Sequence, residues 1–146
     1  MQKVSKNIEE TAQIAKEFLS KIKPDKKTAT IVALCGDLGV GKTAFTQVLA
    51  RELGIKRKVN SPTYVIVKNY KIKAKNYKLF FHIDAYRLKN EKELAHLGWP
   101  EIIQNPEHLV FIEWPGRIQK ALPKKHHKIE ISHTKEGHRK FKIKKY

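Results

Sequence analysis

Gly36-Asp37-Leu38-Gly39-Val40-Gly41-Lys42-Thr43 is the stretch that decides the fold, because it has the form G-x-x-x-x-G-K-[ST]. The residues before it, 30–35, are apolar and suit a β-strand, whereas residues 44–53 carry apolar side chains at helical spacing. A glycine-rich loop between a strand and a helix presents backbone N–H groups and a helix N-terminus to phosphate oxygens. The pattern therefore predicts an α/β P-loop NTPase domain that spans residues 1–146.

Two side chains at the end of this loop suit triphosphate chemistry. Lys42 provides a positive charge for the β- and γ-phosphates, and Thr43 provides a hydroxyl group for Mg²⁺. Guanine recognition by GTPases uses an Asn-Lys-x-Asp run, which this sequence does not contain. We therefore expect a nucleoside triphosphate, with Mg²⁺, at this loop, and the missing run argues against a GTPase.

A hydrolytic site of this kind also needs carboxylates near the phosphates. Asp84 follows the apolar run 79–83, and Glu113 follows the apolar run 109–112. A carboxylate at the end of a buried strand is costly unless a cation or hydrogen-bond donors stabilise it. Lys42, Asp84 and Glu113 are therefore the predicted catalytic residues.

The remaining pattern predicts a mixed parallel and antiparallel sheet flanked by helices. The short lysine-rich connection after residue 70 favours an antiparallel hairpin over a helical crossover. Two alternating runs near the end of the chain predict a C-terminal β-hairpin with Ile129, Ile131, Phe141 and Ile143 facing inward. The expected helices are 8–22, 43–53, 91–97 and 100–103, and the expected strands are 29–35, 64–70, 79–84, 109–112, 128–132 and 140–146.

The chain is strongly basic, with a net charge of +17, and residues 56–78 and 119–146 carry almost all of the excess. Two interpretations stay open: a general lysine-rich surface, or a dedicated face for nucleic acid such as tRNA or for an acidic protein. The single cysteine and the absence of an apolar N-terminal segment indicate a cytoplasmic protein that does not enter membranes.

Four motifs in order and spacing resemble the TsaE family: residues 36–43, Ser61-Pro62-Thr63-Tyr64, His82-Ile83-Asp84-Ala85-Tyr86-Arg87-Leu88 and Glu113-Trp114-Pro115. The resemblance covers roughly residues 5–118. It implies a small ATPase that supports the formation of threonylcarbamoyladenosine on tRNA. The implied protein partners are TsaB-like and TsaD-like, and the implied cofactors are ATP and Mg²⁺.

The resemblance also implies roles for individual residues. Thr43 and Glu113 resemble the Mg²⁺ ligands, and Asp84 resembles an acid near the metal and the attacking water. Ser61 and Thr63 lie in a switch-like loop that would sense the γ-phosphate. The implied nucleotide-binding residues are Gly39, Val40, Gly41, Lys42, Thr43, Ala44, Thr11 and Trp114.

Two positions keep alternative interpretations. Trp114 is expected either at the nucleotide or partner surface or as a half-buried packing residue. His82 is expected either to pack or orient Asp84, or to be an ordinary strand histidine. Two functions also compete with the leading hypothesis. One is a nucleotide-gated module in which ATP mainly sets the affinity for a partner. The other is a basic NTPase that binds nucleic acid directly.

Overall fold

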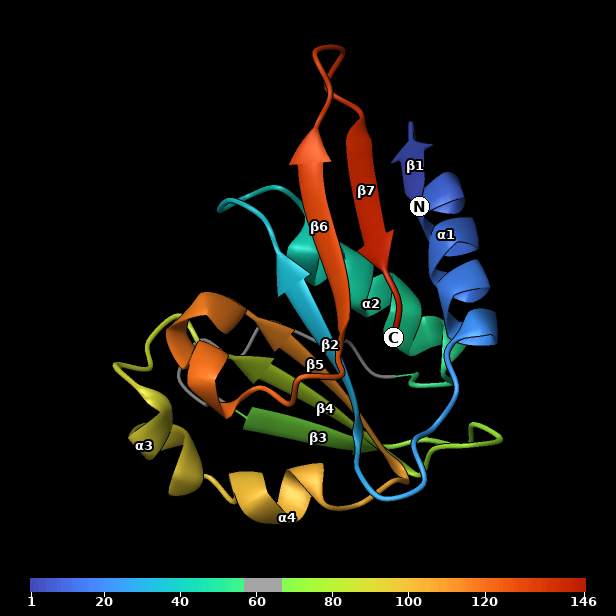
Figure 1. Ribbon diagram of the computed structural model, residues 1–146. Coiled ribbons are helices and arrows are strands. Elements are labelled where there is room, and N and C mark those ends of the chain that lie inside the picture. Colours follow the sequence, from blue (N-terminus) through green and yellow to red (C-terminus); the bar gives the residue numbers. More distant parts are fainter. Residues whose placement is uncertain (57–66) are drawn as a thin grey trace.

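The computed structural model describes residues 1–56 and 67–146, which form one seven-stranded sheet with helices on both faces (Figure 1). The elements are β1 (Gln2–Ser5), α1 (Ile8–Lys21), β2 (Thr30–Cys35), α2 (Lys42–Glu52), β3 (Val67–Lys71), β4 (Leu79–Asp84), α3 (Glu91–Ala95), α4 (Trp99–Ile103), β5 (His108–Glu113), the 3₁₀ helix η1 (Pro115–Ala121), β6 (His127–His133) and β7 (Arg139–Lys144).

The strand order is β1-β7-β6-β2-β5-β4-β3. The four central strands, β6, β2, β5 and β4, run parallel to one another, whereas β7 and β3 pair antiparallel with β6 and β4, and β1 pairs antiparallel with β7. The fold is therefore the predicted mixed sheet flanked by helices, and β6 and β7 form the predicted C-terminal hairpin. The structure of residues 64–66, in the first expected hairpin, lies outside the described residues.

Two apolar layers hold the helices to the sheet. Helices α1 and α2 cover one face, and the inward side chains of the C-terminal hairpin (Ile129, Ile131, Phe141 and Ile143) are buried there, as predicted. The other layer packs α3, α4 and η1 against β2, β5 and β4, and Val67 of β3 packs at its margin. Alternate side chains of a strand face opposite layers, so each residue's position in its strand decides which layer it joins.

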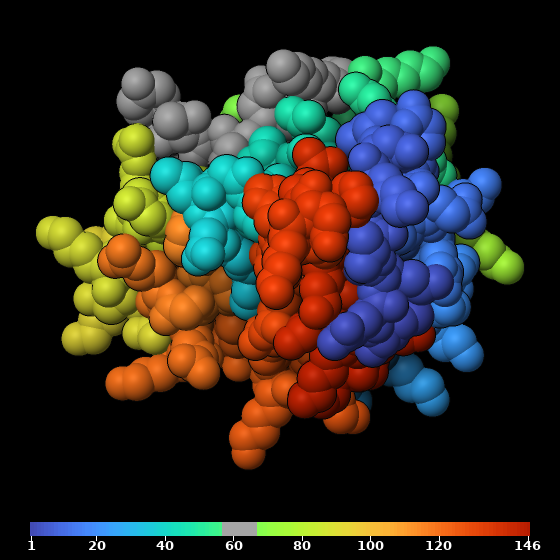
Figure 2. All heavy atoms as spheres, turned by 90° about the horizontal axis from the view of Figure 1, so that it is seen from above, coloured from blue at the N-terminus to red at the C-terminus, as the bar shows by residue number. Residues whose placement is uncertain are grey.

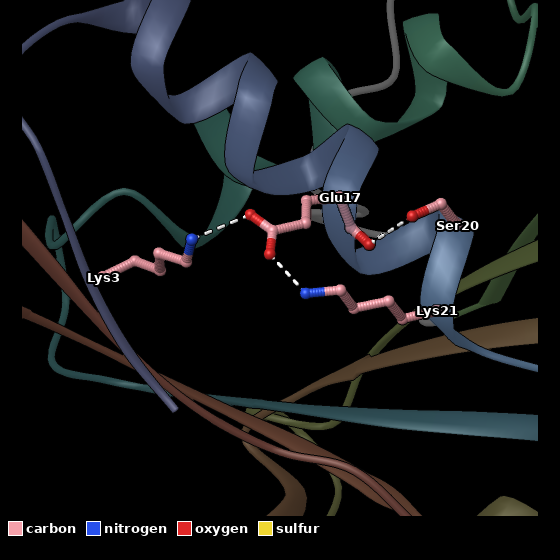
Figure 3. A network of polar contacts seen from close by, with 4 residues as sticks. All are labelled: Lys3, Glu17, Ser20 and Lys21. Carbon is pink, nitrogen blue, oxygen red and sulfur yellow. Dashed lines mark hydrogen bonds and ion pairs between the residues drawn. The ribbon is translucent and has the colours of Figure 1, made fainter.

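The edge strand β1 was not predicted from the sequence, and an ion-pair network ties it to α1. Glu17 of α1 accepts from Lys3 of β1 at 2.9 Å and also pairs with Lys21 one helical turn later, while Ser20 donates to the Glu17 carbonyl (Figure 3). The two lysines lower the pKa of Glu17 from 4.5 to about 2. Asn7 caps the start of the same helix by accepting from the Glu10 N–H at 2.9 Å.

Within the described ranges, no helix has the length and apolar character needed to cross a membrane. Helix η1 was also missing from the prediction, because Pro115 and Gly116 break the apolar periodicity on which helix predictions depend.

Candidate nucleotide site

The phosphate loop joins the end of β2 to the start of α2 and turns on glycines with positive φ angles. Gly41, directly before α2, has a φ of 105°, which side-chain-bearing residues rarely adopt. A Cβ atom at Gly41 would lie 2.7 Å from Nε of Arg139 in β7. The backbone angle therefore favours glycine here, and any larger residue would also displace the arginine side chain.

Lys42 is buried in spite of its charge, with an exposed fraction of 5%. Its Nζ donates to the carbonyl oxygens of Gly36 and Asp37 at 2.6 and 2.8 Å and lies 4.3 Å from the centre of the Trp114 ring. Burial lowers the pKa of Lys42, and the carboxylate of Glu113 is the strongest opposing influence. The loop carbonyls and the indole ring thus hold the ammonium group at the mouth of the loop.

The two predicted acids lie beside each other at the same edge of the sheet. Asp84 ends β4 and pairs in register with Glu113, which ends β5, and Glu113 also pairs with Leu34 near the end of β2. The carboxyl ends of parallel strands are where open α/β sheets place their ligands. The topology therefore brings both carboxylates to the edge from which the phosphate loop starts.

Glu113 is buried, with 3% of its surface exposed, and a histidine holds it. Nε2 of His82 lies 2.6 Å from Oε2 of Glu113, and His82 is itself fully buried. His82 was expected to pack or to orient Asp84; it is packed in the interior, but its hydrogen bond goes to Glu113 and not to Asp84. His82 and Asp84 are two residues apart on β4 and face the same side, but the hydrogen bond goes diagonally across to β5.

Aromatic rings form the outer wall of the site. The Trp114 ring lies 5.1 Å from that of Tyr86, and the guanidinium carbon of Arg117 lies 5.6 Å from the centre of the Tyr86 ring. Trp114 has a φ of 57°, the only positive φ of a non-glycine residue within the described ranges. This left-handed turn directly after Glu113 points the chain away from the sheet and sets the indole beside Lys42.

A hollow of 430 Å³ opens between the phosphate loop and these strand ends. Its walls contain predicted residues from all three regions of the sequence: Gly39, Gly41, Lys42, Thr43, Asp84, Glu113 and Trp114. Val40 is buried in the apolar layer, and Ala44 does not line the hollow. Thr11 is fully buried, and its hydroxyl is hydrogen-bonded to Ser5 at 2.6 Å, away from these walls. Ser61 and Thr63 lie outside the described residues.

The residues of the hollow fit a magnesium ion that is shared with phosphate. No group of three His, Cys, Asp or Glu side chains in residues 1–56 and 67–146 would hold a metal alone. Mg²⁺, however, usually takes only one or two protein oxygens and completes its shell with water and phosphate. Thr43 and Glu113, which carry hard oxygen donors, both line this hollow.

Three features of this site were not predicted. These are the bond between His82 and Glu113, the contact of Arg139 with the phosphate loop, and the Arg117 guanidinium group over the Tyr86 ring at the outer wall. The histidine carries a signal, because period-two alternation puts it on the face of Asp84. The sequence contains no signal for the position of Arg139, because that position depends on the register of the C-terminal hairpin.

Comparison with known proteins supports a single family. The family model described as "Threonylcarbamoyl adenosine biosynthesis protein TsaE" matches residues 5–141. A Bacillus subtilis protein named "tRNA threonylcarbamoyladenosine biosynthesis protein TsaE" is 37% identical over 133 residues, which cover 91% of this chain and 78% of that protein. A Haemophilus influenzae protein of the same name is 37% identical over 73% of this chain and 64% of its own length. The crystal structure of Bacillus subtilis YdiB superimposes with a TM-score of 0.77 at 30% identity, covering 98% of this chain and 83% of that one.

Proposed function

The chain belongs to the TsaE family of tRNA threonylcarbamoyladenosine biosynthesis, and on that premise we propose that it binds Mg²⁺-ATP in the hollow between residues 36–43 and the ends of β4 and β5 and hydrolyses it. The proposal rests on the meeting of four side chains from distant parts of the sequence at one hollow. Lys42, Thr43, Asp84 and Glu113 come from three separate parts of the chain and line one hollow. A glycine turn alone would not require two carboxylates beside it.

Each side chain has a task that follows from its position. Lys42 would turn its ammonium group to the β- and γ-phosphate oxygens, where charge develops during phosphoryl transfer. Glu113, held by His82, and Thr43 would hold Mg²⁺, which neutralises phosphate charge when bound. Asp84 lies at the edge of the same hollow, and its carboxylate would orient the attacking water.

Steady-state ATP hydrolysis and calorimetric ATP binding test this assignment. Lys42→Ala should abolish both, whereas Asp84→Asn and Glu113→Gln should reduce hydrolysis more than binding. Asp25→Asn is a matched control, because Asp25 is a carboxylate in a turn that does not line this hollow. Hydrolysis by Lys42→Ala at the rate of the unmodified protein would refute the site.

Partners of the TsaB-like and TsaD-like kind belong to the same proposal, and the rim of the hollow favours a nucleotide-gated contact with them as the second candidate function. Leu38 and Tyr86 line the hollow while exposing 86% and 51% of their surfaces. Exposed apolar side chains next to a nucleotide would let the γ-phosphate alter a docking surface.

The two functions give different binding data. Affinity for the purified partner pair would be compared with ATP, ADP and a non-hydrolysable analogue, using the unmodified protein and Leu38→Ala. If ATP mainly gates docking, the analogue should support partner binding as well as ATP does, and Leu38→Ala should weaken partner binding more than it changes hydrolysis. Equal affinity in all nucleotide states would refute gating.

A further inference from the structure

The outer face of the β6–β7 hairpin is not covered by any described helix. Its inward side chains pack on α1 and α2, whereas the apolar layer of α3, α4 and η1 contains no residue of β6 or β7. In Figure 1 this hairpin faces the viewer with no helix in front of it, and Figure 2 shows it at the surface beside the N-terminal residues. A sheet face left open in this way is available to a partner.

Lysine dominates the open face. Lys140 and Lys142 of β7 lie opposite Ser132 and Glu130 of β6, and Lys144 lies opposite Lys128. Glu130 compensates one of these charges, since Lys128 pairs with it at 2.6 Å. Two lysines placed directly opposite each other on neighbouring strands destabilise a sheet. Three cations are thus left for an anionic partner, and its binding would relieve their repulsion.

The basic face continues past the end of the hairpin into a hollow with aromatic walls. Lys128 and His126 line a hollow of 290 Å³, and His126 and Tyr146 line the next one, of 540 Å³. The rings of His126 and Tyr146 lie 6.2 Å apart and tilted by 33°, and Nζ of Lys144 lies 5.1 Å from the Tyr146 ring centre. Tyr146 exposes 59% of its surface, so its ring is open to stacking.

The rows of lysine side chains and the exposed aromatic rings together indicate the chemistry of the ligand. Ammonium groups neutralise phosphates without reading sequence, and aromatic side chains stack on unpaired bases. An acidic protein would satisfy the lysines but would leave the stacking surface without a use. We propose that the basic face, defined by His126, Lys128, Lys140, Lys142, Lys144 and Tyr146, binds a single-stranded segment of RNA. This binding uses none of the residues assigned to nucleotide hydrolysis.

Fluorescence anisotropy with a labelled 12-nucleotide single-stranded RNA, titrated at several salt concentrations, tests the proposal. Each lysine that neutralises a phosphate should contribute about 0.7 to the slope of log affinity against log salt. K140Q/K142Q/K144Q should therefore bind at least tenfold more weakly, with a slope smaller by about 2. Tyr146→Ala should weaken binding about fivefold or more because the stacking ring is removed, and Tyr146→Phe should restore it.

A matched control removes three exposed lysines elsewhere, in K89Q/K92Q/K120Q, on and beside α3. It should keep nearly full affinity, and all variants should keep normal ATP hydrolysis. Equal losses in both triple variants would overturn the proposal and indicate a general lysine surface. Polyglutamate of equal charge that competes as well as RNA, together with an unaffected Tyr146→Ala, would assign the face to an acidic protein instead.

Discussion

The hydrogen bond between His82 and Glu113 gives the sharpest test of how the site is built. His82→Leu replaces the imidazole by an apolar side chain of similar size and removes the donor that holds Glu113 Oε2 at 2.6 Å. Glu113 stays in place, with 3% of its surface exposed. The substitution therefore changes the partner of a buried carboxylate and leaves the carboxylate itself unaltered.

Two opposing effects set the size of the change. Removing one partner of a buried pair costs about 3–5 kcal/mol. Nδ1 of His82, however, is buried and has no hydrogen-bond partner among the described residues, and such an atom costs about 1–3 kcal/mol. Leucine removes that second cost. The free energy of unfolding should therefore fall by a net amount of about 2 kcal/mol.

Urea unfolding followed by circular dichroism, without nucleotide, measures this difference. His82→Leu with Glu113→Leu should recover most of the loss, because replacing both members of a buried pair is often neutral. His108→Leu, a buried histidine at the other end of β5, controls for general loosening of the sheet. A loss below about 0.5 kcal/mol in His82→Leu, the usual range of surface changes, would refute the view that the histidine holds Glu113.

Three further predictions concern the loop, the edge strand and the indole. Gly41→Ala should lower the free energy of unfolding in urea by about 1–3 kcal/mol and weaken ATP binding. Alanine rarely adopts a φ of 105°, and its methyl group would also meet Arg139. Unchanged ATP affinity would show that the loop does not need this turn. The pKa of Glu17 is lowered from 4.5 to about 2, so its contribution to stability is complete above pH 4.5 and is lost as the pH falls toward 2. The difference in unfolding free energy between the unmodified protein and Glu17→Gln should shrink over that range, and a constant difference would contradict the ion pairs. Mg²⁺-ATP should change the tryptophan fluorescence of the Trp99→Phe variant, which keeps Trp114, but not that of Trp114→Phe. The reason is that the ammonium group of Lys42 lies 4.3 Å from the centre of the Trp114 ring. The reverse pattern would place the nucleotide elsewhere.

Local patterns predicted most of the fold. The phosphate loop needs glycines and a following helix within one short segment, so its sequence alone defines it. The hairpin face of Ile129 and Phe141 follows from period-two alternation, and the buried positions agree with it. The strand β1 escaped prediction because its four residues are too few to show a period, and its extended form depends on pairing with β7, which is distant in sequence.

The contacts in the site that the sequence did not predict join segments that are far apart along the chain. His82 and Asp84 share one face of β4, and the sequence offers no means to decide which carboxylate the histidine contacts. The register of β4 against β5 decides it, and that register depends on the packing of two apolar layers. Arg139 reaches the phosphate loop for a similar reason, through the pairing of β7 with β6.

The place of β2 at the centre of the sheet has a consequence for synthesis on the ribosome. Both neighbours of this strand, β5 and β6, come much later in the chain, beginning at His108 and His127. At about 5–20 residues per second, β2 waits roughly 4–15 seconds after its last residue, Cys35, before β5 begins to be made. During that time an apolar strand has two open edges, which are prone to aggregation. Nascent chains that stop before β5 should therefore depend on chaperones and fail to bind nucleotide.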